Sequence, residues 1–277
     1  MTGSSLRDAV RSGIQPFLGV YDVFSASIVG RHADNVFLSG FGFAASQFGL
    51  PDVGFVGWSD MVAYLERVRA VLPGHRILVD VDDGYGDSDI AAHVARRVER
   101  AGATGIVLED QRRPRRCGHA DGRQVLELEE FLVKLERVLA AREDLFVVAR
   151  TDASGTEEIE RRVVAFAEAG ADAVLADGVA DLELVRRLRD RAGVPVAFNQ
   201  IAGGRSEPHS LQELEAAGVS IAVFSTPCLF AAQEAVDEAV RALLAPGGRL
   251  PASGEGVGLA DCTRLLETNL VRRDSEE

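Results

Sequence analysis

The chain has few cysteines and no long apolar run. Its three cysteines, Cys117, Cys228 and Cys262, are odd in number and far apart, so they provide no disulfide framework and suit the reducing cytoplasm. No stretch reaches the ~20 apolar residues of a membrane span, and residues 1–13 lack the apolar region of a signal peptide. We therefore expect a cytoplasmic protein.

Positive charge is also scarce. Lys and Arg number 30 against 43 Asp and Glu, which gives a formal net charge of −13. A surface of that charge repels nucleic acid and anionic membranes, so we expect neither as a partner. A small anionic substrate would need local arginines or a metal ion.

The length and the composition suit one folded domain. Hydrophobic residues make up 47% of the chain and charged residues 26%, as in soluble globular proteins, which excludes a disordered or collagen-like chain. The 277 residues exceed the ~100–200 of an ordinary domain, but α/β barrels reach this length as single units.

Short runs rich in Val, Ile, Leu and Phe alternate with longer segments of helical periodicity. Eight such runs predict β-strands, at residues 17–21, 36–39, 76–80, 105–109, 146–150, 173–176, 195–199 and 221–225. The segments between them include predicted helices at 60–72, 89–101, 128–141, 157–169, 182–192 and 231–244. We expect the strands to be parallel.

Several predicted helices end in Ala-Gly directly before a strand, as at Gly102, Gly170, Gly193 and Gly218. Glycine there permits the left-handed backbone that turns a helix back toward the next strand. Eight such units predict an α/β fold, a (β/α)8 barrel of the TIM type. An open doubly wound sheet has the same local pattern and stays open as an alternative.

The chain continues beyond the eighth unit. We expect the barrel to occupy residues 1–245, and residues 246–277 to form a Gly/Pro-rich linker and a last helix at 259–273. Cys262, Leu265, Leu266 and Leu270 give this helix an apolar stripe. A closed barrel has no need of the stripe, which a partner subunit could cover.

Acidic side chains gather where the predicted strands end, which in a barrel is the edge that carries the active site. They are Asp80, Asp82 and Asp83 after strand three, Glu109 and Asp110 after strand four, Asp152 after strand five and Asp177 after strand six. Converging carboxylates repel one another unless a cation lies among them. Oxygen ligands without histidine favour Mg²⁺ or Mn²⁺ over Zn²⁺. The alternative is that these acids only cap the following helices.

The loop after strand four, residues 111–123, contains a possible reactive thiol. Cys117 lies among four arginines and next to Gly118 and His119. Positive neighbours lower the pKa of a thiol, which can then donate or accept a proton or act as a nucleophile. The alternative is a surface loop with an incidental cysteine.

The second predicted strand leads into Ser39-Gly40-Phe41-Gly42, which fits the start of a dinucleotide-binding fingerprint. We reject that interpretation, because Pro51 interrupts the segment and the next strand ends in acids rather than in a ribose ligand. Ser39 and the glycine amides suit a substrate carboxylate better. Tyr21, at the end of the first strand, faces the same rim or packs in the barrel.

Taken together, these motifs resemble the isocitrate lyase and phosphoenolpyruvate mutase superfamily, and in particular its 2-methylisocitrate lyase and carboxyphosphonoenolpyruvate phosphonomutase branch. The resemblance rests on three segments, 39–52, 80–86 and 108–119, and spans residues 17–273. It implies a (β/α)8 barrel, Mg²⁺ and a mobile Cys-Gly-His loop. It also implies a C-terminal helix swapped between the subunits of a dimer or homotetramer.

The resemblance assigns roles to individual residues. Asp80, Asp82 and Glu109 match metal ligands, direct or through water, and Asp52 matches a further acid near the metal. The expected substrate-binding residues are Ser39, Gly40, Phe41, Arg115, Gly118, His119, Arg150, Asp177 and Asn199. Cys117 matches the catalytic thiol of the lyases.

The implied reaction is cleavage of a small 2-hydroxy di- or tricarboxylic acid into a 2-oxo acid and a carboxylic acid. Tyr21 is the candidate base for the hydroxyl proton. Arg150 would stabilise the departing enolate-like carboxylate, and Cys117 would protonate it. His119 belongs to the same catalytic group.

The chain departs from the family pattern at three positions. Arg115 stands where the lyases have lysine, although Lys134 is the only lysine in this sequence and a general preference for arginine would explain the change. Asp177 replaces glutamate, and Ala202 replaces an acid. The alternatives are a phosphonomutase acting on a phosphonoenolpyruvate-type substrate, an oxaloacetate decarboxylase, and a catalytically silent barrel that binds a carboxylate.

Overall fold

A computed structural model describes residues 2–118, 122–251 and 256–274. Within them, eight parallel strands pair in sequence order, and β1 pairs with β8 to close the barrel. The strands are β1 (Gln15–Val20), β2 (Asn35–Leu38), β3 (Arg76–Asp80), β4 (Gly105–Glu109), β5 (Phe146–Thr151), β6 (Ala173–Ala176), β7 (Val196–Gln200) and β8 (Val219–Phe224). The predicted barrel is confirmed, and the open sheet is excluded.

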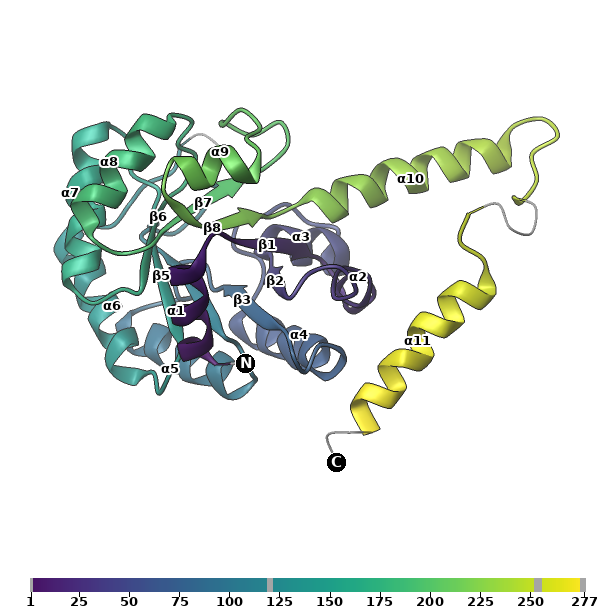
Figure 1. Ribbon diagram of the computed structural model, residues 1–277, viewed down its shortest axis with the longest axis horizontal. Helices are drawn as coiled ribbons and strands as arrows, with labels where there is room; N and C mark the ends of the chain where they lie inside the picture. Colours follow the sequence, from purple (N-terminus) through teal and green to yellow (C-terminus); the bar gives the residue numbers. More distant parts are fainter. Residues whose placement is uncertain (1, 119–121, 252–255, 275–277) are drawn as a thin grey trace.

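Helices surround the barrel (Figure 1). Those that follow the strands are α2 (Val23–Val29), α3 (Gly40–Phe43) with the π-helix η1 (Ala44–Phe48), α4 (Trp58–Val71), α5 (Ser88–Arg100), α6 (Leu128–Ala141), α7 (Thr156–Glu168), α8 (Leu182–Ala192), α9 (Leu211–Ala216) and α10 (Pro227–Leu244). Gly102, Gly170, Gly193 and Gly218 all have positive φ, between 68° and 99°, which confirms their predicted turning role.

Three helical segments were absent from the sequence prediction: α1 (Gly3–Ser12), α2, and α3 with η1. The stretch after β2 is therefore helical as far as Phe48, before Pro51, although no helix had been predicted there. Helix α1 buries Leu6 and Val10 against strand residues such as Phe17 and Phe146, and so closes the N-terminal end of the barrel. These segments are ten residues or shorter, too short for helical periodicity to identify.

The C-terminal segment leaves the barrel and returns (Figure 1). Helix α10 projects away with no buried residue, and α11 (Leu259–Asp274) packs against α4 and α2 of the same chain. Asn269 Nδ2 donates a hydrogen bond of 2.9 Å to Ser27 Oγ. The predicted last helix is confirmed, whereas the division at residue 245 and the swap between subunits stay predictions. No helix in the described ranges is long and apolar enough to span a membrane.

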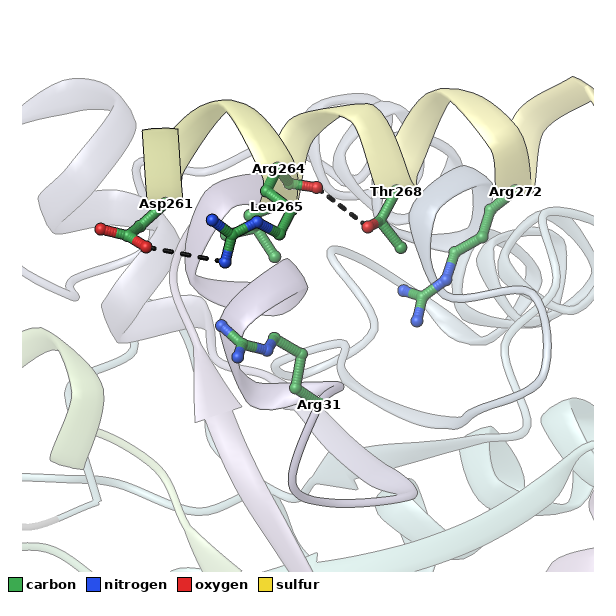
Figure 2. Close-up of a pocket in the computed structure, with 6 residues that line it drawn as sticks. All are labelled: Arg31, Asp261, Arg264, Leu265, Thr268 and Arg272. Carbon is green, nitrogen blue, oxygen red and sulfur yellow. Dashed lines mark hydrogen bonds and ion pairs between the residues drawn. The ribbon is translucent and has the colours of Figure 1, made fainter. Parts of the chain in front are cut away.

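A crevice of about 270 Å³ lies under α11 (Figure 2). Arg31, from the turn after α2, faces α11 there, and Asp261, Arg264, Leu265, Thr268 and Arg272 complete the lining. Because α2 runs from the C-terminal end of β1 to the start of β2, Arg31 lies at the N-terminal end of the barrel. The crevice contains none of the residues predicted for the active site.

Candidate active site

The site continues the inward-facing side of the strands. Alternate residues of a strand share one face, and the barrel interior is filled by residues such as Phe17, Leu78 and Val107. Two positions further along, that face becomes polar. The polar residues are Ser39 after Phe37, Asp80 after Leu78, Glu109 after Val107, Arg150 after Val148, Asp177 after Leu175, Asn199 after Ala197 and Ser225 after Val223. The barrel thus brings them together at its C-terminal end.

The acids predicted to bind metal converge on the β2, β3 and β4 side of this end. Asp80, Asp82 and Glu109 are buried, with 7%, 3% and 1% of their surfaces exposed. A Cβ atom placed on Gly40 would lie 3.3 Å from both Asp80 Oδ2 and Asp82 Oδ1. Gly40 therefore lies directly over the two carboxylates, where a larger residue would crowd them.

Arg115 binds these acids. Its Nε donates to Glu109 Oε1 at 2.9 Å, its Nη1 donates to Asp52 Oδ1, and its Nη2 lies 3.2 Å from Asp82 Oδ1. The side chain is 1% exposed. The guanidinium thus joins the predicted metal ligands to Asp52, and its predicted contact with substrate stays a prediction.

Arg150 organises the neighbouring side of the site. Its Nη2 lies 2.7 Å from Asp177 Oδ2 and 3.3 Å from Glu109 Oε2, and its Nε donates to Asp152 Oδ2 at 2.9 Å. Asn199 Nδ2 donates to Asp177 Oδ1 at 3.0 Å. One ion-pair network therefore connects the ends of β4, β5, β6 and β7.

Two further residues of this network were not among our predicted site residues. Arg123 Nη1 lies 2.9 Å from Asp152 Oδ1, and Ser225 Oγ donates to Asn199 Oδ1 at 2.6 Å. Asp152 had been noted as an acid but given no role. The alternation along β5 and β8 would have identified Asp152 and Ser225, whereas Arg123 lies in a loop and left no such signal.

The site carries more negative charge than its arginines balance. Six carboxylates (Asp52, Asp80, Asp82, Glu109, Asp152 and Asp177) face three guanidinium groups (Arg115, Arg123 and Arg150), which leaves three negative charges in excess if all ionise. Burial raises the pKa of Asp80 and Asp82, and it raises the pKa of Glu109 to about 8. A bound cation would reverse this effect by favouring the charged forms.

The donor set fits a hydrated divalent cation. Among the described residues, Asp82 Oδ1 and Glu109 Oε2 are buried without a hydrogen-bond donor, although an arginine lies 3.2 and 3.3 Å from them, respectively. In the same part of the chain, no three His, Cys, Asp or Glu side chains are placed to hold a metal by themselves. Mg²⁺ is commonly held by one or two carboxylates, with water and substrate completing its shell. The residues therefore suit Mg²⁺ or Mn²⁺ bound partly through water.

The loop after β4 brings Cys117 toward this network. Gln111 closes the base of the loop, since its side chain donates to Arg116 O at 2.7 Å and accepts from Arg116 N at 2.8 Å. A Cβ atom on Gly118 would lie 1.9 Å from Asp177 Oδ2 and 2.3 Å from Arg150 Nη2. Only glycine fits there. Cys117, next to it, is half-buried and forms no disulfide, and its lowered pKa stays a prediction.

Three predicted residues on the β8, β1 and β2 side differ in their contacts. Ser39 Oγ accepts a hydrogen bond of 3.2 Å from Gly42 N and so caps α3, while its hydroxyl proton is left to donate, and its predicted contact with substrate stays a prediction. Phe41 packs edge-on against Phe230, with 6.2 Å between ring centroids. Burial, chiefly, raises the pKa of Tyr21, which disfavours the phenolate that its predicted role as a base requires.

His119 lies outside the described residues, so its predicted role stays a prediction.

The described part of the site has a charged side and an aromatic side. Its charged side chains come from the ends of β3 to β6, the segment between η1 and α4, and the loop after β4. The aromatic pair comes from α3 and α10, which follow β2 and β8. Such a site can hold the carboxylates of a small acid at one side and an apolar substituent at the other.

The fold and the site define a TIM barrel with a buried, acid-rich centre at the C-terminal ends of its strands, and similarity to known proteins agrees with this description. The family model for phosphoenolpyruvate phosphomutase matches residues 9–244. The chain belongs to the phosphoenolpyruvate mutase/isocitrate lyase superfamily, whose members include lyases, mutases and hydrolases.

Two relatives and one solved structure illustrate the similarity. A 2,3-dimethylmalate lyase of Eubacterium barkeri is 33% identical over 79% of this chain and 77% of its own. A 2-methylisocitrate lyase of Aeropyrum pernix is 30% identical over 83% and 75%. An oxaloacetate acetylhydrolase solved with 3,3-difluorooxalacetate superposes with a TM-score of 0.90 at 28% identity, over 99% of this chain and 95% of that one.

Proposed function

We propose that this chain is a Mg²⁺-dependent carbon–carbon lyase that cleaves a small 2-hydroxy di- or tricarboxylic acid into a 2-oxo acid and a carboxylic acid. The observation that carries the proposal is the seating of Gly118 against Arg150 and Asp177. Because Cys117 is adjacent to Gly118 in sequence, this contact supports a position for the thiol near the Arg150 guanidinium. A proton donor, a counter-charge for an enolate and a cation site thus meet at one place.

The residues act on the substrate in complementary ways. The bond between the hydroxyl-bearing carbon and its neighbour breaks as the hydroxyl passes its proton to one of the buried carboxylates of the site and becomes a carbonyl. The electron pair of that bond passes to the departing fragment, whose enolate-like charge Arg150 stabilises. Cys117 donates the proton that completes the carboxylic acid. Mg²⁺, when bound by Asp80, Asp82 and Glu109, supplies electrophilic stabilisation of the hydroxyl oxygen.

The remaining contacts support these groups. Asn199 orients Asp177 through its 3.0 Å hydrogen bond, and Asp177 in turn orients Arg150. The protonated phenol of Tyr21 serves better as a hydrogen-bond donor to substrate than as the base. Burial of the whole centre strengthens each electrostatic contact and keeps water from the carbanion.

The experiment is proton and phosphorus NMR of the purified protein with Mg²⁺ and a panel of substrates. The panel contains 2-methylisocitrate, isocitrate, 2,3-dimethylmalate, oxaloacetate and phosphonopyruvate. Wild type is compared with Cys117→Ser and with Cys228→Ser, a second half-buried free cysteine that serves as the matched control. We expect release of a 2-oxo acid by wild type and Cys228→Ser, and about 10²–10⁴ less by Cys117→Ser.

Each other outcome favours a different function. Phosphorus transfer within phosphonopyruvate would indicate a phosphonomutase. Carbon dioxide release from oxaloacetate that survives Cys117→Ser would indicate a decarboxylase. Mg²⁺-dependent binding of the acids without turnover would indicate a silent barrel and refute the lyase.

We also propose that the chain assembles as a dimer or tetramer through its C-terminal helices. The support is the exposure of apolar residues along the projecting arm, namely Val236 at 62%, Leu244 at 81% and Leu259 at 86%. The molar mass measured by light scattering after size-exclusion chromatography tests the assembly. A monomer at micromolar concentration would refute it.

A further inference from the structure

The turn after β3 has an unusual backbone. Asp82, Gly84 and Tyr85 have φ values of 49°, 82° and 65°. Residues other than glycine adopt this left-handed region rarely, and they persist there only when the surrounding structure holds them. The turn also carries Asp80 and Asp82, so whatever holds its backbone holds these two carboxylates together.

Two cations hold the turn at Asp83. Arg113 binds the Asp83 carboxylate with two hydrogen bonds, Nε to Oδ2 at 2.8 Å and Nη2 to Oδ1 at 2.7 Å. Lys134, from α6, donates from Nζ to the Asp83 carbonyl at 2.7 Å. We call Arg113, Asp83 and Lys134 the Asp83 clamp.

Two of the three clamp residues are buried, whereas the Arg113 side chain is 43% exposed. The Asp83 side chain is 4% exposed and Lys134 is 6% exposed. Both line the floor of a hollow of about 480 Å³, together with Arg113 and Gln111. Burial lowers the pKa of Lys134 because it disfavours the charged ammonium. The contacts of Lys134 with the turn must therefore offset the free energy of burying that charge.

The clamp also joins the turn to the loop that carries Cys117. Arg113 and Arg115 belong to that loop, and they bind neighbouring acids of the turn. Arg113 binds Asp83, and Arg115 lies 3.2 Å from Asp82. The loop cannot leave the turn without breaking both ion pairs.

We propose that Lys134 and Arg113 are positioning residues that lock the turn of residues 80–85 and the Cys117 loop into one unit. Lys134 fixes the backbone of the turn from α6, and Arg113 transmits that position to the loop. The benefit to catalysis rests on the proposed lyase function. The locking of the turn to the loop does not depend on that function, so the experiments below use no substrate.

The first experiment measures Mn²⁺ binding to the free protein by electron paramagnetic resonance. Lys134→Met removes the donor, and Lys134→Arg keeps one. Arg137→Met is the matched control, because Arg137 lies one turn further along α6 and pairs with the exposed Asp89. We expect Lys134→Met to weaken Mn²⁺ binding about 10- to 100-fold, as loss of support around a metal ligand does. Lys134→Arg should recover most of this loss, and Arg137→Met should stay within twofold of wild type.

The second experiment measures how often the loop opens. Trypsin cleaves after arginine, and Arg112 and Arg116 are exposed in the loop, whereas cleavage after Arg113 is blocked by Pro114. Mass spectrometry locates the cuts. We expect Lys134→Met, which changes no residue of the loop, to increase cleavage at Arg112 or Arg116 several-fold, and Arg137→Met to leave it unchanged.

A purely structural role would give a different result. If Lys134→Met lowers the melting temperature but leaves Mn²⁺ affinity and loop cleavage within twofold of wild type, the proposal is wrong. Absence of Mn²⁺ binding in the wild type would also overturn it. If Lys134→Met does not fold, Arg113→Met provides the same two measurements. A wild type that binds Mn²⁺ normally but cleaves no acid would refute the lyase and leave the clamp standing.

Discussion

Replacing Glu109 with glutamine will remove a pH dependence from the stability of the metal-free protein. Burial raises the pKa of Glu109 from an ordinary 4.5 to about 8. Between these values the folded state holds a proton that the unfolded state has lost, so stability falls as the pH rises. The difference of 3.5, at about 1.4 kcal/mol for each pH unit, amounts to about 5 kcal/mol in all, which is reached only above pH 8.

Urea unfolding in a metal chelator, at intervals from pH 5 to pH 8.5, measures this effect. Glu109→Gln cannot ionise, so its free energy of unfolding should fall less steeply by about 4 kcal/mol over the range. The exposed Glu129→Gln is the control and should follow the wild type. Mg²⁺ should flatten the wild-type curve, because a cation favours the ionised form. Equal slopes for wild type and Glu109→Gln would refute the reasoning.

Two further substitutions test the loop and the aromatic side of the site. Gly118→Ala places a methyl group 1.9 Å from Asp177 Oδ2, so we expect kcat/KM to fall at least about 100-fold with the circular dichroism spectrum unchanged, as for other small misplacements of a catalytic group. Activity within tenfold of wild type would contradict this. Phe230→Ala opens the contact with Phe41, so kcat/KM should fall about 10-fold for 2-hydroxy acids bearing an alkyl group and change little for malate. An equal loss for both substrates, or any loss in the exposed control Gln233→Ala, would count against an apolar subsite.

The barrel could be predicted from sequence because its signal is repeated. Each strand is an apolar run, and each of several helices ends at a glycine with positive φ, such as Gly102 and Gly170. The acids at Asp80, Asp82 and Glu109 could be placed together because parallel strands end at one edge. The short helices α1 and α2 could not be predicted, since they have too few turns for periodicity to distinguish them from loops.

The contacts made by the loops were beyond sequence reasoning. Nothing in the spacing indicates that Arg115 lies against Asp52, because an irregular segment from Gly49 to Gly57 carries Asp52 to the site. The same holds for Gly118, whose fit against Asp177 depends on the path of a whole loop. Motifs predicted which residues take part, and only the three-dimensional path decided which of them touch.

The Asp83 clamp has a practical consequence. Lys134 is the only lysine of the chain, so apart from the N-terminal amine an amine-reactive reagent has one side chain to label. Lys134 is 6% exposed, so the reagent reaches it only when the surrounding structure opens. When local opening is fast, the rate of acylation equals the intrinsic rate multiplied by the fraction of open molecules. The acylation rate of Lys134 therefore measures how often the turn opens in solution, and no engineered probe is needed.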